Sequence, residues 1–363
     1  MKKVVVVNFV AKHSYLFIRR MIEGFIYNDC YVFAIVSKNM PEIEEWRNLK
    51  GIELYEVDGY QSIVDFPKKL FTFIRRDAKA INNRISELKP SCIYLPIFTY
   101  WSLPINKSIN KLPVIYAMHD PEVHEKKRVV ARYMNTKLGK SATYIVILSE
   151  VFREFVKKKY HKDELHVITV PSGLENEVAG ITTLIDYDDN KTNFLFQGRI
   201  DKYKGLEVLA EAYKMLYAEN KEITLTVAGS GDFSLYLKTY EELPNCTVIN
   251  RWLTNEEVSG LFNARNVITV LPYTSATQSG VINVAMPCGS PIIATRCGGI
   301  VEQITDNENG YLVNPNDAND LYLKMKYVSE HKEEWKRIRE NGYKHMKELS
   351  WEILSKKIVD IMN

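Results

Sequence analysis

Short apolar segments alternate with stretches of helical period along almost the whole chain, and this alternation limits the possible fold most strongly. A first series predicts a helix at 15–26 and strands at 1–8, 32–37, 52–57, 92–96, 114–118 and 144–148. A second series predicts a helix at about 204–218 and strands at 194–197, 223–228, 246–249 and 267–271. Strands separated by helices predict an α/β protein whose parallel sheets are covered on both faces.

The length of the chain and one change of composition predict its domains. A chain of 363 residues can form two separate cores. Between the two series lies an acidic segment, 175–190, that lacks a clear period. We therefore expect an N-terminal domain over 1–175, a C-terminal domain over 176–345 and a terminal helix over 346–363.

Composition also narrows the setting in which the protein works. No run of about 18 apolar residues occurs, and the apolar start is too short for a signal peptide, so we expect a cytoplasmic protein. Five scattered cysteines without a C-x-x-C pair argue against a disulfide framework and a zinc site. Residues 1–175 carry 28 Lys and Arg against 19 Asp and Glu, a net +9, whereas residues 176–363 carry 20 against 26, a net −6. The basic half is expected to meet an anionic partner.

A basic segment with aromatic residues begins at Phe66 in this first half. Apolar residues recur there at helical spacing and are expected in the core, at Leu70, Ile74, Ala78, Ile81, Ile85 and Leu88. The residues expected to face an anionic membrane are Lys68, Lys69, Phe71, Arg75 and Arg76. Two more basic runs, 126–128 and 157–159, add charge. An ordinary solvated face is the alternative, and nucleic acid is not expected because no recognised binding module accompanies the charge.

The stretch from Leu271 to Ile304 contains two strand-to-helix turns that are rich in small residues. A polar loop follows the apolar strand, and a helical pattern begins at Val281. Backbone N–H groups at a helix start lack partners within the helix, and the helix dipole favours negative charge. The pattern therefore predicts either a phosphate site or two ordinary turns of an α/β sheet.

A second candidate site follows the strand at 194–197, in the sequence GRIDKYKG. Arg199 and Lys204 stand between a strand end and a helix start, where a guanidinium and an ammonium could together neutralise a diphosphate. A Lys-Gly pair before a helix also occurs commonly without any such role.

Several motifs follow one another in the second half, reading GRIDKYKGLEVLAEA, VAGSGD, RWLTNEEVSGLFNARNVITVLPY, QSGVINVAMPCGSPIIAT, GGIVEQI and NENGYLV. Together they resemble the donor-binding domain of glycosyltransferase family 4, in the subset with a QSG motif. HDPEVH and the segment 146–150 extend the resemblance into the first half. The resemblance implies a retaining enzyme of the B-type glycosyltransferase fold, with two Rossmann-like domains facing a cleft and a terminal helix that crosses back to the first domain.

The resemblance also assigns roles to single residues. Arg199 and Lys204 would bind the donor diphosphate and stabilise the leaving nucleotide, and His119 would contact the donor sugar near the reacting carbon. The donor-binding set that it implies comprises Gly198, Gly229, Gly231, Arg251, Trp252, Leu253, Gln278, Ser279, Gly280 and Val281. In that set, 279–281 would offer backbone N–H groups to the distal phosphate, and 251–253 would border the base.

The chain departs from the family pattern in two places. Many members carry two glutamates eight residues apart, the second of which binds ribose, but the corresponding positions here hold Ala276 and Val284. The glycine-rich loop that usually follows the first strand is also absent from the sequence. The residues that stand there are expected to face the acceptor: Lys12, His13, Ser14 and Tyr15.

The expected function is transfer of a hexose-type sugar from a nucleoside diphosphate sugar, such as a UDP-sugar, to a saccharide or lipid-linked saccharide. We expect this step in cell-surface polysaccharide synthesis, at the inner face of the membrane. No metal or other cofactor is expected, because the D-x-D sequence at 186–188 lies in the segment between the domains. Two alternatives stay open, a nucleotide-sugar 2-epimerase with the same two-domain fold and a non-catalytic sugar-nucleotide-binding protein.

Overall fold

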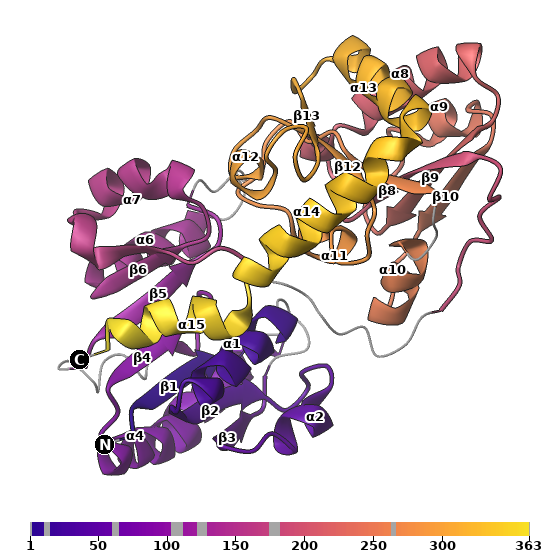
Figure 1. Ribbon diagram of the computed structural model, residues 1–363. Coiled ribbons are helices and arrows are strands. Elements are labelled where there is room, and N and C mark those ends of the chain that lie inside the picture. Colours follow the sequence, from indigo (N-terminus) through magenta and orange to yellow (C-terminus); the bar gives the residue numbers. More distant parts are fainter. Residues whose placement is uncertain are drawn as a thin grey trace. The chain divides into compact units, whose positions relative to one another are not determined.

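The computed structural model describes residues 2–10, 15–59, 65–102, 112–121, 129–173, 182–262 and 266–362. The chain divides into two compact units, the first formed by Met1–Pro171 with Ser350–Asn363 and the second by Ser172–Leu349 (Figure 1). The boundary predicted at residue 175 lies outside the described residues. The boundary predicted at 346 falls inside the last helix of the second unit, α14 (Trp335–Glu348), just before the chain enters the first unit at Ser350.

The first unit is built on a parallel sheet in which seven strands are described. The strand order is β3-β2-β1-β4-β5-β6-β7, so the first strand lies inside the sheet. The bounds of the strands are β1 (Val4–Phe9), β2 (Tyr31–Ser37), β3 (Ile52–Val57), β4 (Cys92–Leu95), β5 (Val114–Met118), β6 (Tyr144–Ile147) and β7 (Val167–Thr169). The first six confirm the predicted strands to within a few residues. The short β7 carries too little pattern to be predicted.

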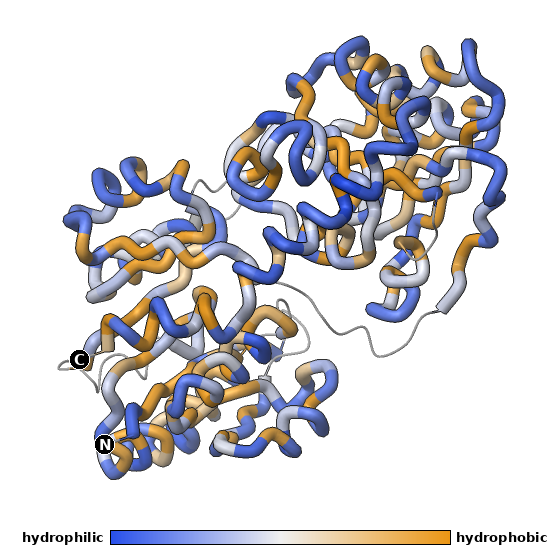
Figure 2. Tube along the Cα trace, in the orientation of Figure 1, coloured by the Kyte–Doolittle hydropathy of each residue, from blue (hydrophilic) through white to orange (hydrophobic). Residues whose placement is uncertain are grey.

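Helices pack their apolar faces on this sheet, and Figure 2 shows hydrophobic residues concentrated along its strands. The α-helices that the structure describes before the last one are α1 (Tyr15–Tyr27), α2 (Ile43–Arg47), α3 (Phe66–Thr72), α4 (Ala78–Leu88), α6 (Val129–Ser141) and α7 (Arg153–Tyr160). Val6, Ile35 and Ile93 lie at the centre of the core with no exposed surface. The strands are apolar on both faces because helices cover both sides.

The segment from α3 to α4 corrects one prediction. Helical spacing placed Ile74 in the core, but Ile74 is 49% exposed and Phe73 is buried instead. The reason is a π-helix over Phe73–Asp77, in which the N–H of Ala78 bonds to the carbonyl of Phe73, five residues back. A π-turn holds an extra residue, so the inward face shifts by one position where a strict α-helical period would have continued.

The terminal helix α15 (Trp351–Asp360) lies on the first unit, alongside α1 (Figure 1). Trp351, Leu354 and Ile358 are buried. Asn28 donates from Nδ2 to the Glu352 carbonyl and to Ser355 Oγ, at 2.9 and 3.0 Å. The last helix of the chain is thus part of the first unit, beside a strand–helix–strand unit from the opposite end of the sequence.

The second unit contains another parallel sheet, with the order β10-β9-β8-β11-β12-β13 in its described residues. The strands are β8 (Thr192–Gln197), β9 (Ile223–Gly229), β10 (Cys246–Asn250), β11 (Val267–Leu271), β12 (Ile292–Thr295) and β13 (Tyr311–Val313). In each unit the chain adds strands outward on one side of the first strand and then on the other. This is the order of a Rossmann-like domain, which the family resemblance implied.

The helices of the second unit lie on both faces of this sheet. They are α8 (Leu206–Glu219), α9 (Leu237–Glu241), α10 (Asn255–Phe262), α11 (Gly280–Ala285), α12 (Ile300–Gln303), α13 (Ala318–Glu330) and α14. Helices α8 and α13 pack together, and one continuous core joins the strands to them. In the part of the chain that is described, no helix is both long and apolar enough to cross a membrane.

Candidate functional site

The two loops singled out in the sequence meet at one edge of the second sheet. Strands β8 and β11 are parallel neighbours, and the chain leaves them toward opposite sides of the sheet. A crevice forms at such a switch point in doubly wound sheets, outside the carboxyl ends of the strands. A Cβ added to Gly198, after β8, would lie 3.6 Å from Cγ2 of Val281, after β11. The fold therefore brings both predicted loops together.

Close backbone packing explains the glycines in these loops. Gly205 has φ +68°, and a Cβ there would lie 1.9 Å from the carbonyl oxygen of Pro272. Gly229 has φ +153°, and its Cβ would lie 1.8 Å from the carbonyl oxygen of Gly198. A Cβ on Gly231 would likewise lie 2.1 Å from the Ile200 carbonyl oxygen. The glycines let neighbouring loops approach each other and so shape the site.

Lys204 ends a short 3₁₀ turn and is buried between two tyrosine rings. Its Nζ lies 3.5 Å from the ring centroid of Tyr273 and 5.0 Å from that of Tyr203. The Tyr203 carbonyl accepts hydrogen bonds from the N–H and the hydroxyl of Thr274, which ties the turn to the β11 loop. Burial, together with the nearby positive charge of Arg199, lowers the pKa of Lys204 to about 8. The site thus holds a preorganised ammonium that is charged at neutral pH.

Arg199 provides a second and more exposed charge at the end of β8. Its side chain is 63% exposed, and Nη2 donates to the Tyr203 hydroxyl at 3.1 Å. The Asp201 carboxylate lies 3.8 Å from Nε and also accepts from the Lys202 N–H, which starts the 3₁₀ turn. Two positive groups converge here at a strand end, as the sequence predicted.

The loop between β11 and α11 differs from its predicted role at Ser279. The Ser279 N–H was expected to face a phosphate, but it donates to Oε1 of Gln303 at 2.8 Å. Gln303 Nε2 in turn donates to the Ser279 carbonyl and to Asn283 Oδ1, both at 3.1 Å. Sequence reasoning missed Gln303, although it lies within the GGIVEQI motif, because the contact joins positions 24 residues apart.

Gly280 and Val281 begin α11 and therefore have backbone N–H groups with no acceptor inside the helix. A Cβ on Gly280 would meet no atom of the described chain within 4 Å. Gln278 accepts at Oε1 from the Ser172 N–H, 2.9 Å away, and so holds the first residues of the unit to this loop. Helix α11 is only six residues long, so individual N–H groups matter here more than a helix dipole.

The three residues predicted beside the base follow β10. Arg251 forms a bidentate ion pair with Glu257, at 2.7 and 2.9 Å, which lowers the pKa of Glu257 to about 2. Trp252 is 78% exposed, whereas Leu253 is buried. A cavity of about 640 Å³ opens next to them between β10 and α9, with Gly231 and Asn250 in its wall. Of the three, Trp252 alone offers a free flat surface.

His119 follows β5 in the first unit. Its Nε2 lies 2.9 Å from the Pro96 carbonyl oxygen, which only accepts, so Nε2 carries the hydrogen and Nδ1 is left as the acceptor. The ring of Phe17 packs edge-on, with centroids 4.8 Å apart. Burial lowers the pKa of His119, against the opposing charge of Asp120. The structure thus holds a neutral imidazole in a fixed orientation at a strand end.

The predicted acceptor residues are described only in part. Tyr15 starts α1 and donates from its hydroxyl to Glu42 at 2.9 Å. Lys12, His13 and Ser14 lie outside the described residues. The D-x-D sequence lies at the amino end of β8, where Asp188 accepts from the Asn190 N–H, so it stands at the opposite edge of the sheet from the two loops. No group of three or more potential metal-binding side chains occurs among the residues that the structure places.

Two Rossmann-like units in one chain define the B-type glycosyltransferase (GT-B) fold, and solved structures of that fold align over nearly the whole chain. Sucrose-phosphate synthase of Thermosynechococcus elongatus aligns with a TM-score of 0.75 and 17% identity, over 99% of this chain and 98% of that one. Alr3699/HepE of Anabaena, solved with UDP and glucose, aligns with a TM-score of 0.71 and 13% identity, over 99% of each chain. At these identities the likeness shows the fold alone.

Sequence comparisons point to the same class of protein. Residues 185–345, most of the second unit, match the family model for Glycosyl transferases group 1. An uncharacterised glycosyltransferase of Methanocaldococcus jannaschii, MJ1178, is 29% identical over 209 residues, which cover 53% of this chain and 54% of that protein. The chain therefore spans about half the length of this curated relative. These similarities connect the second unit with glycosyltransferases.

Proposed function

We propose that the chain is a retaining glycosyltransferase of the family 4 type, in the QSG subset. It moves a hexose-type sugar from a nucleoside diphosphate sugar to a saccharide or lipid-linked saccharide. The observation that carries the proposal is the convergence of Arg199 and Lys204 beside the β11 loop, at the switch point of the unit that matches the family model. An anionic diphosphate is the ligand that this arrangement suits.

Two fixed cations serve the chemical step in this proposal. When the bond between the sugar and the diphosphate breaks, negative charge grows on the leaving phosphate. Lys204, held against Tyr273, and Arg199, at the mouth of the site, stabilise that charge without needing to reorganise. Gly280 and Val281 contribute backbone N–H groups to the distal phosphate. No metal is required in this mechanism, because positive side chains take the role of a divalent ion.

His119 contacts the donor sugar in the proposed reaction. Its neutral ring presents Nδ1 as an acceptor for a sugar hydroxyl, while Nε2 stays bonded to Pro96. Residues 12–15 face the acceptor, and Trp252 and Leu253 border the base. Since Alr3699/HepE was solved with UDP and glucose, UDP is the first nucleotide and UDP-glucose the first donor to test. We place the reaction in cell-surface polysaccharide synthesis, in the cytoplasm at the inner face of the membrane, with no role for nucleic acid.

Calorimetric titration with UDP, GDP and ADP, followed by transfer assays with the matching sugars, tests the proposal. Arg199→Ala and Lys204→Ala should each lower turnover about 100-fold or more. Lys202→Ala is the matched control, because Lys202 lies in the same 3₁₀ turn but is exposed to solvent. Near-normal transfer by both site variants would overturn the assignment of these residues.

The same assays separate the two alternatives. A sugar nucleotide that changes stereochemistry without an acceptor would identify an epimerase. Tight nucleotide binding, with neither transfer nor hydrolysis across an acceptor panel, would identify a non-catalytic binding protein. Ala276 and Val284 make this second outcome worth testing, because neither side chain can accept a hydrogen bond from ribose.

A further inference from the structure

The π-helix between α3 and α4 places an unexpected pair of apolar side chains on the surface of the first unit. Phe71 is 57% exposed and Ile74 is 49% exposed. Residues three apart are neighbours on a helix surface, so the two side chains form one apolar patch. Phe73 takes the core position instead and packs near Trp101, with ring centroids 6.2 Å apart. The shift of register is therefore what brings Ile74 out beside Phe71.

Positive side chains surround this apolar pair. The Arg75 guanidinium lies 4.5 Å from the ring centroid of Phe71, and Lys79 follows about one helical turn later. Lys68, Arg75 and Lys79 are exposed and make no ion pair with the described part of the chain. From residue 66 to residue 80 the sole acidic side chain is Asp77, which is buried. The exposed face of this segment is thus cationic and apolar.

Two of the residues predicted to face a membrane are neutralised within the fold. Lys69 lies 3.5 Å from the Asp58 carboxylate and is partly buried. Arg76 bonds to Asp77 through Nε and Nη2, at 3.0 and 3.2 Å. The structure therefore narrows the available cations of this segment to Lys68, Arg75 and Lys79.

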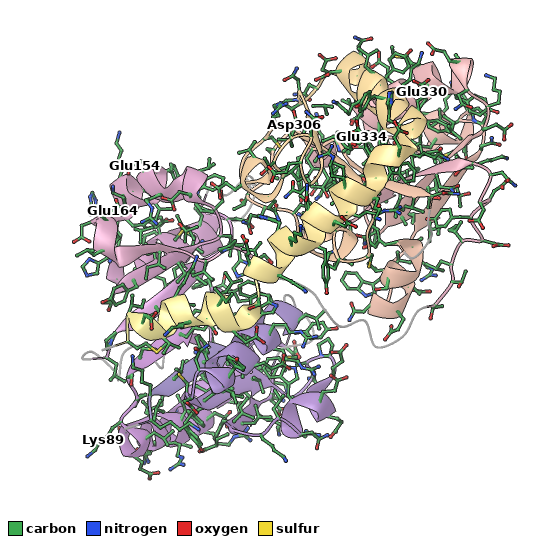
Figure 3. The ribbon with its side chains drawn as sticks, in the orientation of Figure 1. Lys89, Glu154, Glu164, Asp306, Glu330 and Glu334 are labelled. Carbon is green, nitrogen blue, oxygen red and sulfur yellow. The ribbon has the colours of Figure 1, made fainter. Side chains whose placement is uncertain are left out.

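The lysines of α7 do not form a second surface of this kind. Lys157 donates to Glu154 and to Glu164, both at 2.7 Å, and the two carboxylates lie near each other by α7 in Figure 3. Lys159 donates to the Pro121 carbonyl at 3.2 Å. These lysines stabilise the first unit itself. The run at 126–128 lies outside the described residues.

We propose that Lys68, Phe71, Ile74, Arg75 and Lys79 form a docking face for an anionic lipid bilayer. Phe71 and Ile74 enter the boundary between head groups and acyl chains, while the three cations lie among lipid phosphates. The positive charge of the face favours an anionic partner. The exposed apolar pair favours a bilayer over a polyanion, which offers charge alone. The inference goes beyond the proposed reaction, and its test requires no turnover.

Vesicle sedimentation with the full chain at low salt tests the docking face. The protein should bind mixed vesicles of phosphatidylglycerol and phosphatidylcholine. Its affinity for vesicles of pure phosphatidylcholine should be lower by about tenfold or more. Phe71→Ser combined with Ile74→Ser should lower binding to the anionic vesicles about tenfold. Both side chains are exposed, so the variant should fold normally. Leu165→Ser is the matched control, because Leu165 is a 79% exposed apolar residue elsewhere in the same unit.

A second variant separates charge from insertion. Lys68→Gln with Arg75→Gln and Lys79→Gln should reduce binding to anionic vesicles and flatten its dependence on salt, with heparin as the polyanion for comparison. Binding of the unaltered protein to heparin, without binding to anionic vesicles, would assign the face to a polyanion and overturn the proposal. Equal vesicle binding by the unaltered protein and the double serine variant would also overturn it.

Discussion

At the scale of single residues, the buried charge of Lys204 lowers the stability of the second unit but serves its proposed function. The unfolded chain keeps the Lys204 proton up to about pH 10.5, but the folded chain keeps it only up to about pH 8, because burial disfavours the charged form. The destabilisation is therefore complete below pH 8, shrinks between pH 8 and 10.5, and disappears above that window. A buried charge that reduces stability is typical of a residue retained for binding.

Replacing this charge should produce a more stable protein that binds less well. Lys204→Met should raise the free energy of unfolding at pH 7 by about 1–3 kcal/mol, and the gain should fade near pH 10. The same variant should lose most of its affinity for UDP. Urea denaturation at both pH values, together with calorimetry, measures the two effects. Arg199→Met, at an exposed position, should lose affinity without a stability change, and a destabilised Lys204→Met at pH 7 would refute the argument.

Ser279 shows why one part of the site could not be predicted. The sequence indicates a loop with free N–H groups, and that holds for the first turn of α11 by its geometry. One of those N–H groups already bonds to a side chain of α12. The local sequence does not show which one, because the contact comes from a distant segment. Gln303 accepts a hydrogen bond from the Ser279 N–H and donates one to the Ser279 carbonyl.

Gln303→Met should therefore cost about 1–3 kcal/mol of unfolding free energy, because it leaves the buried Ser279 N–H and Asn283 without their partner. Amide hydrogen exchange at 279–281 should accelerate as the loop loosens. Thr269→Val is the comparison, since it breaks a buried hydroxyl pair with Ser290 in the same sheet. If both variants accelerate amide hydrogen exchange at 279–281 equally, the hydrogen bonds of Gln303 do not specifically stabilise the loop.

At the scale of elements, the hydrophobic pattern predicted the long strands and helices well and failed at Ile74. Strands such as β2 and β11 have a run of apolar residues bounded by turns, so local sequence suffices to place them. The π-turn at 73–77 breaks the assumption of a constant helical period. Phe73 and Ile74 are both apolar, so the sequence allows either of them to face the core. Only the packing of Phe73 against the core decides between the two registers.

Helices α1 and α15 together fix the orientation of His119. Phe17 of α1 packs edge-on to His119 and to Trp351 of α15, with ring centroids 4.8 and 5.1 Å apart. If His119 contacts the sugar, Phe17→Leu should lower kcat about tenfold with the Kd for UDP unchanged. It should also raise the pKa of His119 toward its ordinary value, as water reaches the ring, and NMR titration measures that shift.

A second phenylalanine on α1 provides the control for this experiment. Phe25 packs edge-on to Tyr94, with centroids 5.4 Å apart, and is fully buried. Phe25→Leu should reduce stability but leave kcat per folded molecule and the pKa of His119 unchanged. Parallel losses of kcat in both variants would show that Phe17 acts only through general packing.

At the scale of the whole molecule, each unit has its own sheet and core, and the two series of strands in the sequence predicted both. The position of Arg199 and Lys204 at a strand end was also predictable, because strand ends are visible in the sequence. Contacts that join distant segments were not, including Lys204 against Tyr273 and Gly24 against Ser355. Such contacts depend on how elements pack, and one sequence shows only the pattern along the chain.

Two glycine substitutions should separate the stability of the first unit from binding by the second. A Cβ on Gly24 would lie 2.5 Å from Ser355 Oγ and from the Trp351 carbonyl oxygen, so Gly24→Val should push α15 from α1 and cost about 2–3 kcal/mol. UDP affinity should stay within about twofold, because the residues proposed to bind the nucleotide and its phosphates lie in the other unit. Gly280→Ala should show the reverse, with unchanged stability and weaker UDP binding, because the added methyl group occupies space proposed for the distal phosphate. Thermal unfolding and calorimetry on both variants measure this pattern, and a loss of UDP affinity in Gly24→Val that equals the loss in Gly280→Ala would contradict the independence of the two units.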